Sequence, residues 1–508
     1  MTLAHERTNS TILVHLNNVS FSRTYGSDLV KAGFKNINWR INKGETWVIT
    51  GPVGAGKTTL AEALSGKYPV QNGNIQLFDG FSSFHSPVAA GSKISLVSFQ
   101  PNSRLLNYGK FYYQQRYNSS EADSGLTVQE FLTGDQTNKE HLAILENIPK
   151  ALGIPELMSL AVIKLSNGQT RKMLLAKALL QKPILLLLDN PYAGLDTESR
   201  QNLNVLLQEL INQKTNIILI TNPNEIPEFA THVLEIADFN LKGQFTRAEY
   251  LAKQKTEIPA FSPNLPLPLL DFLEPVAKLT DYKICVQFEN TSIKYGEKVV
   301  LHNIYWTVRK GEKWALTGPN GSGKTTLLSL INGDNPQAFA NKITLFDKQK
   351  GTGESIWDLK KRIGFVSPEL HLYFRRAITA EVVAATGFGN TLYLNRPLTA
   401  TEVDLMEYFF SFFQIKPFQQ KPFLQLSTGQ QRLILIIRSL LKNPDLLIWD
   451  EPFQGLSAVL IEQALSLLKA FGNEEKTIIL VSHYSSEIPD WIDKRISLEN
   501  GRISSLIG

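Results

Sequence analysis

Two segments of the chain have the residue types and spacing of a phosphate-binding loop. They read GPVGAGKT at residues 51–58 and GPNGSGKT at residues 318–325, and both fit the pattern G-x-x-x-x-G-K-[ST]. Each follows a strand-like apolar run and opens a helix-like one, so backbone N–H groups and a helix N-terminus would face a phosphate. A glycine turn with a chance lysine would not recur in full, and the pattern therefore predicts two nucleotide sites.

Two side chains of each loop would contact the ligand directly. Lys57 and Lys324 would reach the β- and γ-phosphates of ATP, and the hydroxyls of Thr58 and Thr325 would hold Mg²⁺. The predicted ATP contacts in the loops are Gly51, Pro52, Val53, Gly54, Ala55, Gly56, Lys57, Thr58 and Thr59, and Gly318, Pro319, Asn320, Gly321, Ser322, Gly323, Lys324, Thr325 and Thr326.

An aspartate ends an apolar run in ILLLLDNPYAGLD and again in LLIWDEPFQGLS. Asp189 and Asp450 are therefore predicted to bind Mg²⁺, through water. Glu451 follows the second aspartate and could act as the general base on an attacking water. Asn190 follows the first aspartate, and an amide cannot take a proton from that water.

The elements that must position these residues occur twice. FKNINWRINKGETWVITGPVGAGKTTL, from Phe34, aligns without a gap with LHNIYWTVRKGEKWALTGPNGSGKTTL, from Leu301. The chain is therefore interpreted as two copies of one domain, residues 1–253 and 284–508. Residues 254–283 between them are dense in proline, which interrupts helices and central strands and predicts an extended linker.

Strand-like and helix-like segments alternate within each copy. β-rich segments with turn signals come first, a strand then leads into the glycine loop and a helix, and a more helical middle follows at residues 127–160 and 378–413. Apolar strands close each copy. This order predicts an α/β fold with a mainly parallel sheet covered on both faces, a β-rich N-terminal subdomain and a helical subdomain.

The composition narrows the class of protein. The 508 residues are 43% hydrophobic, enough for two cores. One cysteine, Cys285, excludes an internal disulfide framework and fits a reducing compartment. The net charge of +5 gives no strong nucleic-acid signal. No apolar run approaches the roughly 20 residues that span a bilayer, and the first residues lack a signal-peptide layout, so we expect a cytoplasmic protein.

A further motif narrows the family. LSNGQ, from Leu165, and LSTGQ, from Leu426, each lie just upstream of the apolar strand that ends in aspartate. The order of phosphate loop, LSxGQ, apolar strand with aspartate and GL[DS], found twice, resembles the ATP-binding cassette (ABC) ATPases over nearly the whole chain. Finer details, such as GTGESIWDLKKRIGFVSPELHL and VSHYSSEIPDWI, resemble the tandem ABC group called ModF or PhrA, names that refer to molybdate transport and photorepair.

The resemblance implies an intramolecular dimer of cassettes, in which each ATP lies between the phosphate loop of one half and the LSxGQ of the other. The ATP held by Lys324 would be covered by Ser166, Gly168 and Gln169. The ATP held by Lys57 would be covered by Ser427, Gly429 and Gln430. Serine hydroxyls and glycine N–H groups at a helix start suit a γ-phosphate.

The resemblance also predicts two unequal sites. The Lys324 site would have His483 on the γ-phosphate, Glu451 as base and, from the other half, an intact GLD with Asp196. The Lys57 site would have Gln100 and Asp189, but three of its positions depart from the family pattern. These degenerate positions are Asn190, Asn222 in place of the histidine, and Ser457 in place of the aspartate. Slow hydrolysis there is compatible with an ATP clamp and with neutral drift.

The sequence allows more than one role for several other candidate residues. Glu369 stands where the first copy has Gln100, a departure in the otherwise intact site. Tyr295 is predicted to stack on adenine in the second copy, whereas Tyr25 competes with Phe21 for that role in the first. Ordinary core packing is the alternative for each. NYGKFYYQQRY, from residue 107, could meet a membrane subunit, stack on bases or pack on its own domain.

Two processes could use such a chain. The cassette pair could dock, peripherally on the inner face of the cell membrane, on a separate permease subunit. Alternatively, a soluble ABC protein could act in regulation, DNA repair or translation. The linker is too short for the long charged helical arm of ribosome-acting tandem cassettes, and the sequence has no cysteine cluster for a metal-binding module. We therefore expect a transport-associated ATPase, with ATP and Mg²⁺ as its ligands.

Overall fold

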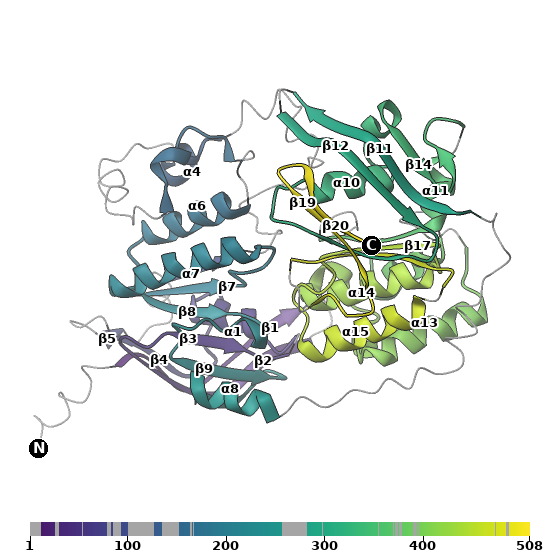
Figure 1. Ribbon diagram of the computed structural model, residues 1–508. Coiled ribbons are helices and arrows are strands. Elements are labelled where there is room, and N and C mark those ends of the chain that lie inside the picture. Colours follow the sequence, from purple (N-terminus) through teal and green to yellow (C-terminus); the bar gives the residue numbers. More distant parts are fainter. Residues whose placement is uncertain are drawn as a thin grey trace, which may run out of the picture. The chain divides into compact units, whose positions relative to one another are not determined.

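The chain forms two compact units, Met1–Ile258 and Pro259–Gly508 (Figure 1). Most of the predicted linker, residues 257–281, lies outside the described residues. The computed structural model describes residues 12–25, 30–52, 54–78, 83–84, 93–99, 126–134, 152–162, 165, 167–256, 282–296, 298–353, 355–368, 370, 374, 378–389, 394, 396–472, 474–483 and 487–508.

The first unit contains one antiparallel and one mainly parallel sheet. The antiparallel sheet has the order β2(Val30–Asn42), β1(Ile12–Tyr25), β4(Asn72–Phe78), β5(Ser83–Phe84). The other sheet has the order β10(Asn240–Thr246), β9(His232–Ala237), β3(Trp47–Thr50), β8(Asn216–Ile220), β7(Leu185–Asp189), β6(Ile94–Ser98), in which only β10 runs antiparallel to its neighbour.

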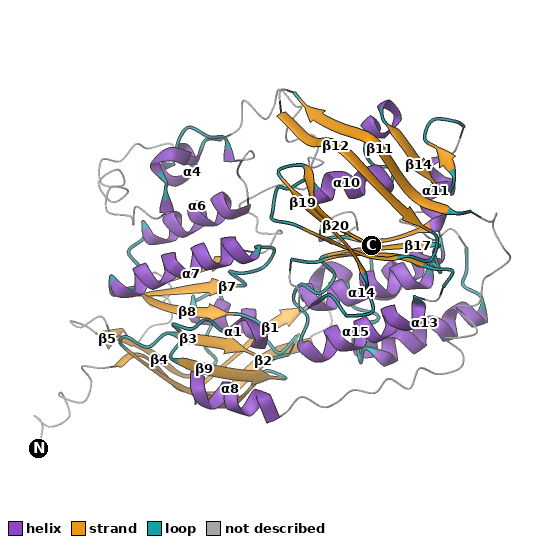
Figure 2. Cartoon of the chain, viewed as in Figure 1, coloured by secondary structure: helices purple, strands orange, loops and turns teal. Residues whose placement is uncertain are grey.

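Helices follow the strands of this sheet, as Figure 2 shows. They are α1(Lys57–Leu64), α4(Val128–Thr133), α6(Asn167–Leu179), α7(Thr197–Asn212) and α8(Arg247–Thr256), with 3₁₀ turns at Pro155–Leu157 and Pro223–Glu225. All five residues of β7 are buried because side chains pack on both faces of the sheet. Leu186 and Leu188 pack with α6 and α7, whereas Leu185 and Leu187 pack with α1 and the antiparallel sheet.

The second unit repeats this plan. Its antiparallel sheet has the order β12(Lys298–Arg309), β11(Ile284–Tyr295), β14(Lys342–Leu345), β15(Lys348–Gln349). Its mainly parallel sheet has the order β16(Ile363–Val366), β17(Leu446–Asp450), β18(Thr477–Val481), β13(Lys313–Thr317), β19(Lys494–Glu499), β20(Arg502–Ile507). The helices are α10(Lys324–Ile331), α11(Ile356–Arg362), α12(Ala380–Ala385), α13(Ala400–Phe412), α14(Thr428–Leu441) and α15(Ala458–Phe471).

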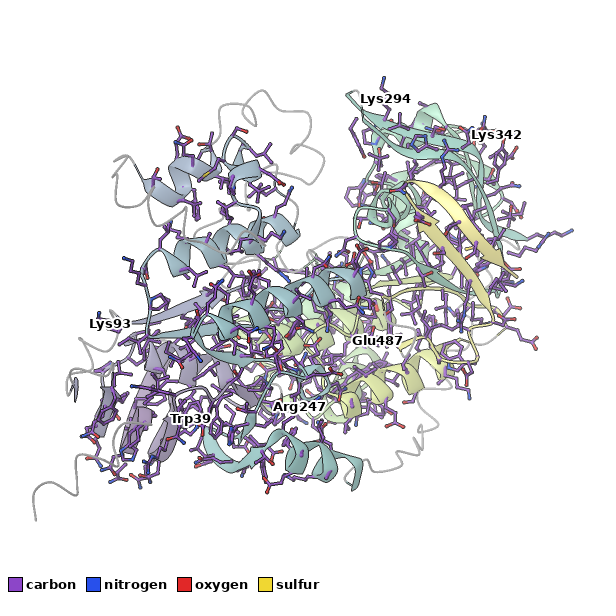
Figure 3. All side chains as sticks on the ribbon, turned by 60° about the vertical axis from the view of Figure 1, so that its left-hand side comes forward. Trp39, Lys93, Arg247, Lys294, Lys342 and Glu487 are labelled. Carbon is purple, nitrogen blue, oxygen red and sulfur yellow. The ribbon has the colours of Figure 1, made fainter. Side chains whose placement is uncertain are left out.

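A tryptophan pair marks the repeat in three dimensions. Trp39, labelled in Figure 3, meets Trp47 edge-on with ring centroids 5.3 Å apart. In the second unit Trp306 meets Trp314 in the same way at 5.6 Å. In both units the antiparallel sheet is thereby packed on the strand that leads into the phosphate loop.

The predicted fold class is confirmed. Each unit has a mainly parallel sheet, a β-rich N-terminal part and a helical part, which includes α4 in the first unit and α12 and α13 in the second. The carboxyl ends of three adjacent strands, β3, β8 and β7, meet at one edge of the first sheet, and those of β13, β18 and β17 meet in the second. Ligands of open α/β sheets bind at this edge.

Candidate functional site

Each phosphate loop turns immediately after its strand. Gly51 follows β3 with a φ of 145°, and a Cβ built on it would lie 1.9 Å from the Ile236 carbonyl oxygen. Gly318 follows β13 with a φ of 137°, and a Cβ there would lie 2.2 Å from the Leu498 carbonyl oxygen. Only glycine fits between loop and strand at these two positions, which explains why both copies start with it.

The loop lysines donate to the carbonyl groups of their own loops. Lys57 Nζ lies 2.7 Å from the Gly51 oxygen and 2.9 Å from the Pro52 oxygen. Lys324 Nζ lies 2.8 Å from the Gly318 oxygen and 2.9 Å from the Pro319 oxygen. Burial lowers the pKa of Lys57 to about 8, although Asp189 acts in the opposite direction. An arriving phosphate would offer each ammonium a stronger acceptor than a carbonyl.

The first unit presents oxygen ligands suited to Mg²⁺. Thr58 Oγ1 donates to Asp189 Oδ2 at 3.0 Å. Burial raises the pKa of Asp189 to about 6, Thr58 and Lys57 oppose that rise, and the charge of Glu62 adds to it. A dication would compensate a carboxylate that burial disfavours, and hydroxyl and carboxylate oxygens are ligands that Mg²⁺ accepts. Asp450 ends β17 in the same way and is 5% exposed, whereas Thr325, at the start of α10, is exposed.

The residue after each aspartate has a left-handed backbone. Asn190 has a φ of 53° and Glu451 a φ of 47°. Their N–H groups donate to Ile220 at 2.9 Å and to Val481 at 3.0 Å, so both are anchored to the neighbouring strand. Asparagine tolerates this conformation, while glutamate adopts it at a cost of about 1 kcal/mol. The glutamate is therefore conformationally unfavourable at position 451, whereas the asparagine suits position 190.

Glu451 and His483 form a partly buried pair in the second unit. His483 Nε2 lies 2.6 Å from Glu451 Oε1, and His483 Nδ1 lies 3.1 Å from the Gly318 carbonyl oxygen. Both ring nitrogens therefore lie within hydrogen-bond distance of oxygen atoms. The Gly318 oxygen thus lies within hydrogen-bond distance of His483 and Lys324, the two residues predicted to contact the γ-phosphate.

The surroundings of Glu451 favour its ionised form. Burial alone would raise the pKa of Glu451, but the hydrogen bond and charge of His483, together with Lys324 and Arg432, hold that pKa below its usual value. An ionised carboxylate at the carboxyl end of β17 can accept a proton from water. The geometry therefore suits a general base.

The corresponding positions of the first unit have a different arrangement. Asn190 Nδ2 donates to Asp189 Oδ1 at 3.2 Å. Asn222 Nδ2 lies 3.4 Å from Glu225 Oε2, and Glu225 Oε1 accepts from Arg200 at 2.7 Å. Neither asparagine can accept a proton at neutral pH.

The LSTGQ motif forms the start of α14. Ser427 is the N-cap residue: its Oγ accepts from the Gln430 N–H at 3.4 Å, and Gln430 Oε1 accepts from the Ser427 N–H at 3.0 Å. Gly429 lies beside Gly455 of the loop after β17. In the first unit Gly168 and Gln169 lie in the first turn of α6. The described signature residues thus sit at helix starts, and Ser166 lies outside the described residues.

Asp196 and Ser457 perform the same local task. Asp196 Oδ1 caps α7 by accepting from the Ser199 N–H at 2.8 Å. Ser457 Oγ caps α15 by accepting from the Leu460 N–H at 3.4 Å. Aspartate and serine are comparably good N-caps. The exchange therefore leaves the helix start intact, and any functional difference must come from the lost carboxylate.

Several predicted positions lie outside the described residues: Val53, Gln100, Glu369 and the tyrosine-rich segment after residue 107. The side chain of Tyr25 also lies outside them. Phe21, its competitor, is 2% exposed and packs on Phe34 at 5.3 Å between ring centroids. Core packing, one of the alternatives for these aromatics, accounts for Phe21.

The sequence interpretation missed a pair of buried arginines. Arg432 in α14 donates to the Ser367 carbonyl oxygen at 2.8 Å and to Gln454 Oε1 at 3.2 Å. Arg171 in α6 donates to the carbonyl oxygens of Pro191 and Ala193. Each arginine thus ties its signature helix to loops that flank the site. The repeat carried a signal, since both arginines stand two residues after the motif's glutamine.

Among the residues that the structure describes, no helix is long and apolar enough to cross a membrane.

Comparisons with known proteins match most of the chain. The family described as ABC transporter matches twice, over residues 34–193 and 301–454. An ABC transporter ATP-binding protein of Schizosaccharomyces pombe is 34% identical over 96% of this chain and 98% of its own length. The ABC transporter ATP-binding protein ModF of Escherichia coli is 35% identical over 90% of this chain and 91% of its own length. YkoD of Bacillus subtilis, described as a putative HMP/thiamine import ATP-binding protein, is 26% identical over 96% of this chain and 90% of its own.

Proposed function

The chain belongs to the ABC transporter family and carries its ATP-binding domain twice, and on that premise we propose that its ATP hydrolysis is performed mainly by the second domain. The observation that carries the proposal is the partly buried pair of Glu451 and His483, with 2.6 Å between Oε1 and Nε2. Asn190 and Asn222 occupy the corresponding positions of the first domain.

The residues of the second domain divide the chemistry among them. Lys324 and His483 leave the Gly318 carbonyl oxygen for the γ-phosphate, and Glu451 is then released from the histidine. Glu451 takes a proton from water as the water oxygen bonds to the γ-phosphorus and the bond to ADP breaks. Thr325 and Asp450 would hold Mg²⁺, which spreads the phosphate charge when it is bound. Tyr295 stacks on the adenine.

The first domain binds ATP without a base to hydrolyse it quickly. Its phosphate loop, Lys57 and the Thr58–Asp189 pair match those of a nucleotide site. The family resemblance implies that this ATP is covered by Ser427, Gly429 and Gln430 of the other half, and that the signature of the first half covers the fast site. ATP retained on the first domain would then hold the two cassettes together while the second domain turns over.

The process that the ATPase serves is membrane transport, through a separate permease subunit. In support, the second domain exposes three large apolar side chains, Phe339, Ile356 and Trp357, which are 63%, 37% and 53% exposed. Lys350 Nζ lies 5.5 Å from the Phe339 ring. Exposed apolar side chains of this kind suit an apolar segment of a partner protein. The resemblance to ModF makes molybdate the first cargo to test. HMP and thiamine are the next, because another relative is described as a putative HMP/thiamine import ATP-binding protein.

The catalytic proposal is tested by two matched substitutions. Glu451→Gln keeps an oxygen for His483 but loses the base, and we expect the rate to fall about 10²–10⁴-fold. Asn190→Ala, at the equivalent position, should change the rate less than about threefold. Equal losses in the two variants would refute the assignment of the fast site.

The transport proposal is tested by affinity purification of the Glu451→Gln variant with ATP, from membranes and from cytosol. An integral membrane protein should copurify, and Trp357→Lys should release it while ATP binding is retained. Recovery with ribosomes or DNA alone, with ATPase activity stimulated by them, would contradict the transport role.

A further inference from the structure

A hydrogen-bond network ties the end of β11 to the phosphate-loop helix. Asn335 is 1% exposed and follows α10. Its Nδ2 donates to the Tyr295 hydroxyl oxygen at 2.9 Å and lies 3.3 Å from Ser329 Oγ, and its Oδ1 accepts from the Gln337 N–H at 3.0 Å. One buried amide thus joins the strand end, the helix that starts at Lys324, and the 3₁₀ turn Pro336–Ala340.

Gln337 holds the residue next to Tyr295. Its Nε2 donates to the Lys294 carbonyl oxygen at 2.9 Å, and its Oε1 accepts from the Lys294 N–H at 3.3 Å. Both backbone groups of Lys294, which Figure 3 labels at this end of the sheet, are therefore bonded to one side chain. The tyrosine is restrained through its hydroxyl and through its backbone.

The ring of Tyr295 itself is half-buried against the core of the second unit. Burial raises the pKa of its hydroxyl, so the phenol keeps its proton at neutral pH. Part of the side chain stays accessible, and a ring fixed at one edge can offer its remaining surface to a flat ligand.

The first unit has different residues at the positions of this hydrogen-bond network. The gapless repeat places Glu62 at the position of Ser329 and Tyr68 at the position of Asn335. There the Tyr68 hydroxyl donates to a carboxylate oxygen of Glu62. Within the described residues, the network therefore occurs in the unit that has Glu451 and His483.

We propose that Asn335 and Gln337 are positioning residues for nucleotide binding, which hold Tyr295 in place to stack on the nucleobase at the fast site. The inference rests on the proposed function of the second domain. The physical reason is pre-organisation: a ring that is already fixed loses less freedom when the base arrives, so more of the stacking energy appears as affinity.

The test is steady-state hydrolysis by the full chain, with inorganic tripolyphosphate as a competitor that has no base. Asn335→Ala should raise the KM for ATP about fivefold, the weight of one buried hydrogen bond. The inhibition constant of tripolyphosphate and kcat should stay unchanged. Tyr295→Phe, which keeps the ring but loses the hydroxyl, should raise the KM for ATP as much as Asn335→Ala does. Combining the two substitutions should raise the KM no further than either one alone.

Controls separate positioning from damage to the fold. Asn332→Ala removes another buried asparagine at the end of α10 whose described partner is Asp334, and its KM should match that of the unchanged chain. If Asn335→Ala does not fold, Gln337→Ala at a half-buried position provides the same test. An unchanged KM for ATP, or an equal rise in the inhibition constant of tripolyphosphate, would overturn the proposed role of Asn335 and Gln337. The Glu451→Gln result decides the proposed function separately, because it concerns kcat.

Discussion

The substitution His483→Asn gives the second domain the residue that the first domain has at the corresponding position, Asn222. The histidine side chain is 4% exposed and bridges Glu451 Oε1 at 2.6 Å and the Gly318 oxygen at 3.1 Å. Asparagine is too short to bridge both oxygens. A hydrogen bond to a charged group contributes about 1.5–3 kcal/mol, so His483→Asn should lower kcat about 10–150-fold.

The same substitution should shift the pH dependence of hydrolysis. In the unchanged chain the pKa of Glu451 lies below its usual value, so the base is ionised throughout the neutral range. Without His483, burial is opposed only by Lys324 and Arg432, and the pKa of Glu451 rises. The kcat/KM profile reports the free enzyme, in which His483 contacts Glu451, so its acidic limb should move to higher pH.

The assay is kcat and kcat/KM measured across pH, with Asn222→Ala as the matched control in the first domain. The control should keep both the rate and the profile, because Asn222 accepts no proton. The reasoning is refuted if His483→Asn stays within about twofold of the unchanged chain with the same acidic limb, or if Asn222→Ala is equally damaging.

Three further predictions concern a signature serine, a helix cap and a buried aspartate. Ser166→Arg should abolish most hydrolysis at saturating Mg-ATP, although it lies in the half opposite Lys324, and an unchanged rate would exclude the cross-half assignment. Ser457→Asp should change the free energy of unfolding by less than about 0.5 kcal/mol, since serine and aspartate can both cap α15. A larger loss of stability in thermal denaturation would contradict that view. Asp189 has a pKa raised from 3.8 to about 6, so its stabilising contribution is complete below pH 3.8 and is lost as pH rises through 6. Asp189→Asn should remove that loss, about 3 kcal/mol. The check is the free energy of unfolding of the ligand-free chain, from urea titrations at pH 4 and pH 7. An equal change in that free energy between the two pH values in both proteins would contradict the prediction.

The parts of the site that the sequence predicted are those whose chemistry lies in contiguous residues. The phosphate loops, the aspartates that end apolar strands and the unequal pair Asn190 and Glu451 could all be identified because a short motif contains both the backbone geometry and the reactive groups. The internal repeat supplied the register in which the two copies differ.

The contacts that the sequence did not predict depend on backbone atoms brought together by the sheet. His483 meets the carbonyl oxygen of Gly318 because β18 lies beside β13, and nothing in either motif specifies that acceptor. Arg432 likewise bonds to a carbonyl group, which no residue type reveals. The left-handed backbone of Glu451 is set by its hydrogen bond to the adjacent strand and could not be inferred from a glutamate.

The most direct test of one fast site per chain is a single-turnover measurement. The full chain is loaded with radiolabelled ATP, Mg²⁺ is added, and the released phosphate is counted against bound nucleotide. The account predicts two ATP bound per chain, a burst of one phosphate, and one ATP retained intact, with the burst lost in Glu451→Gln and kept in Asn190→Ala. A burst of two phosphates at a single rate would contradict it.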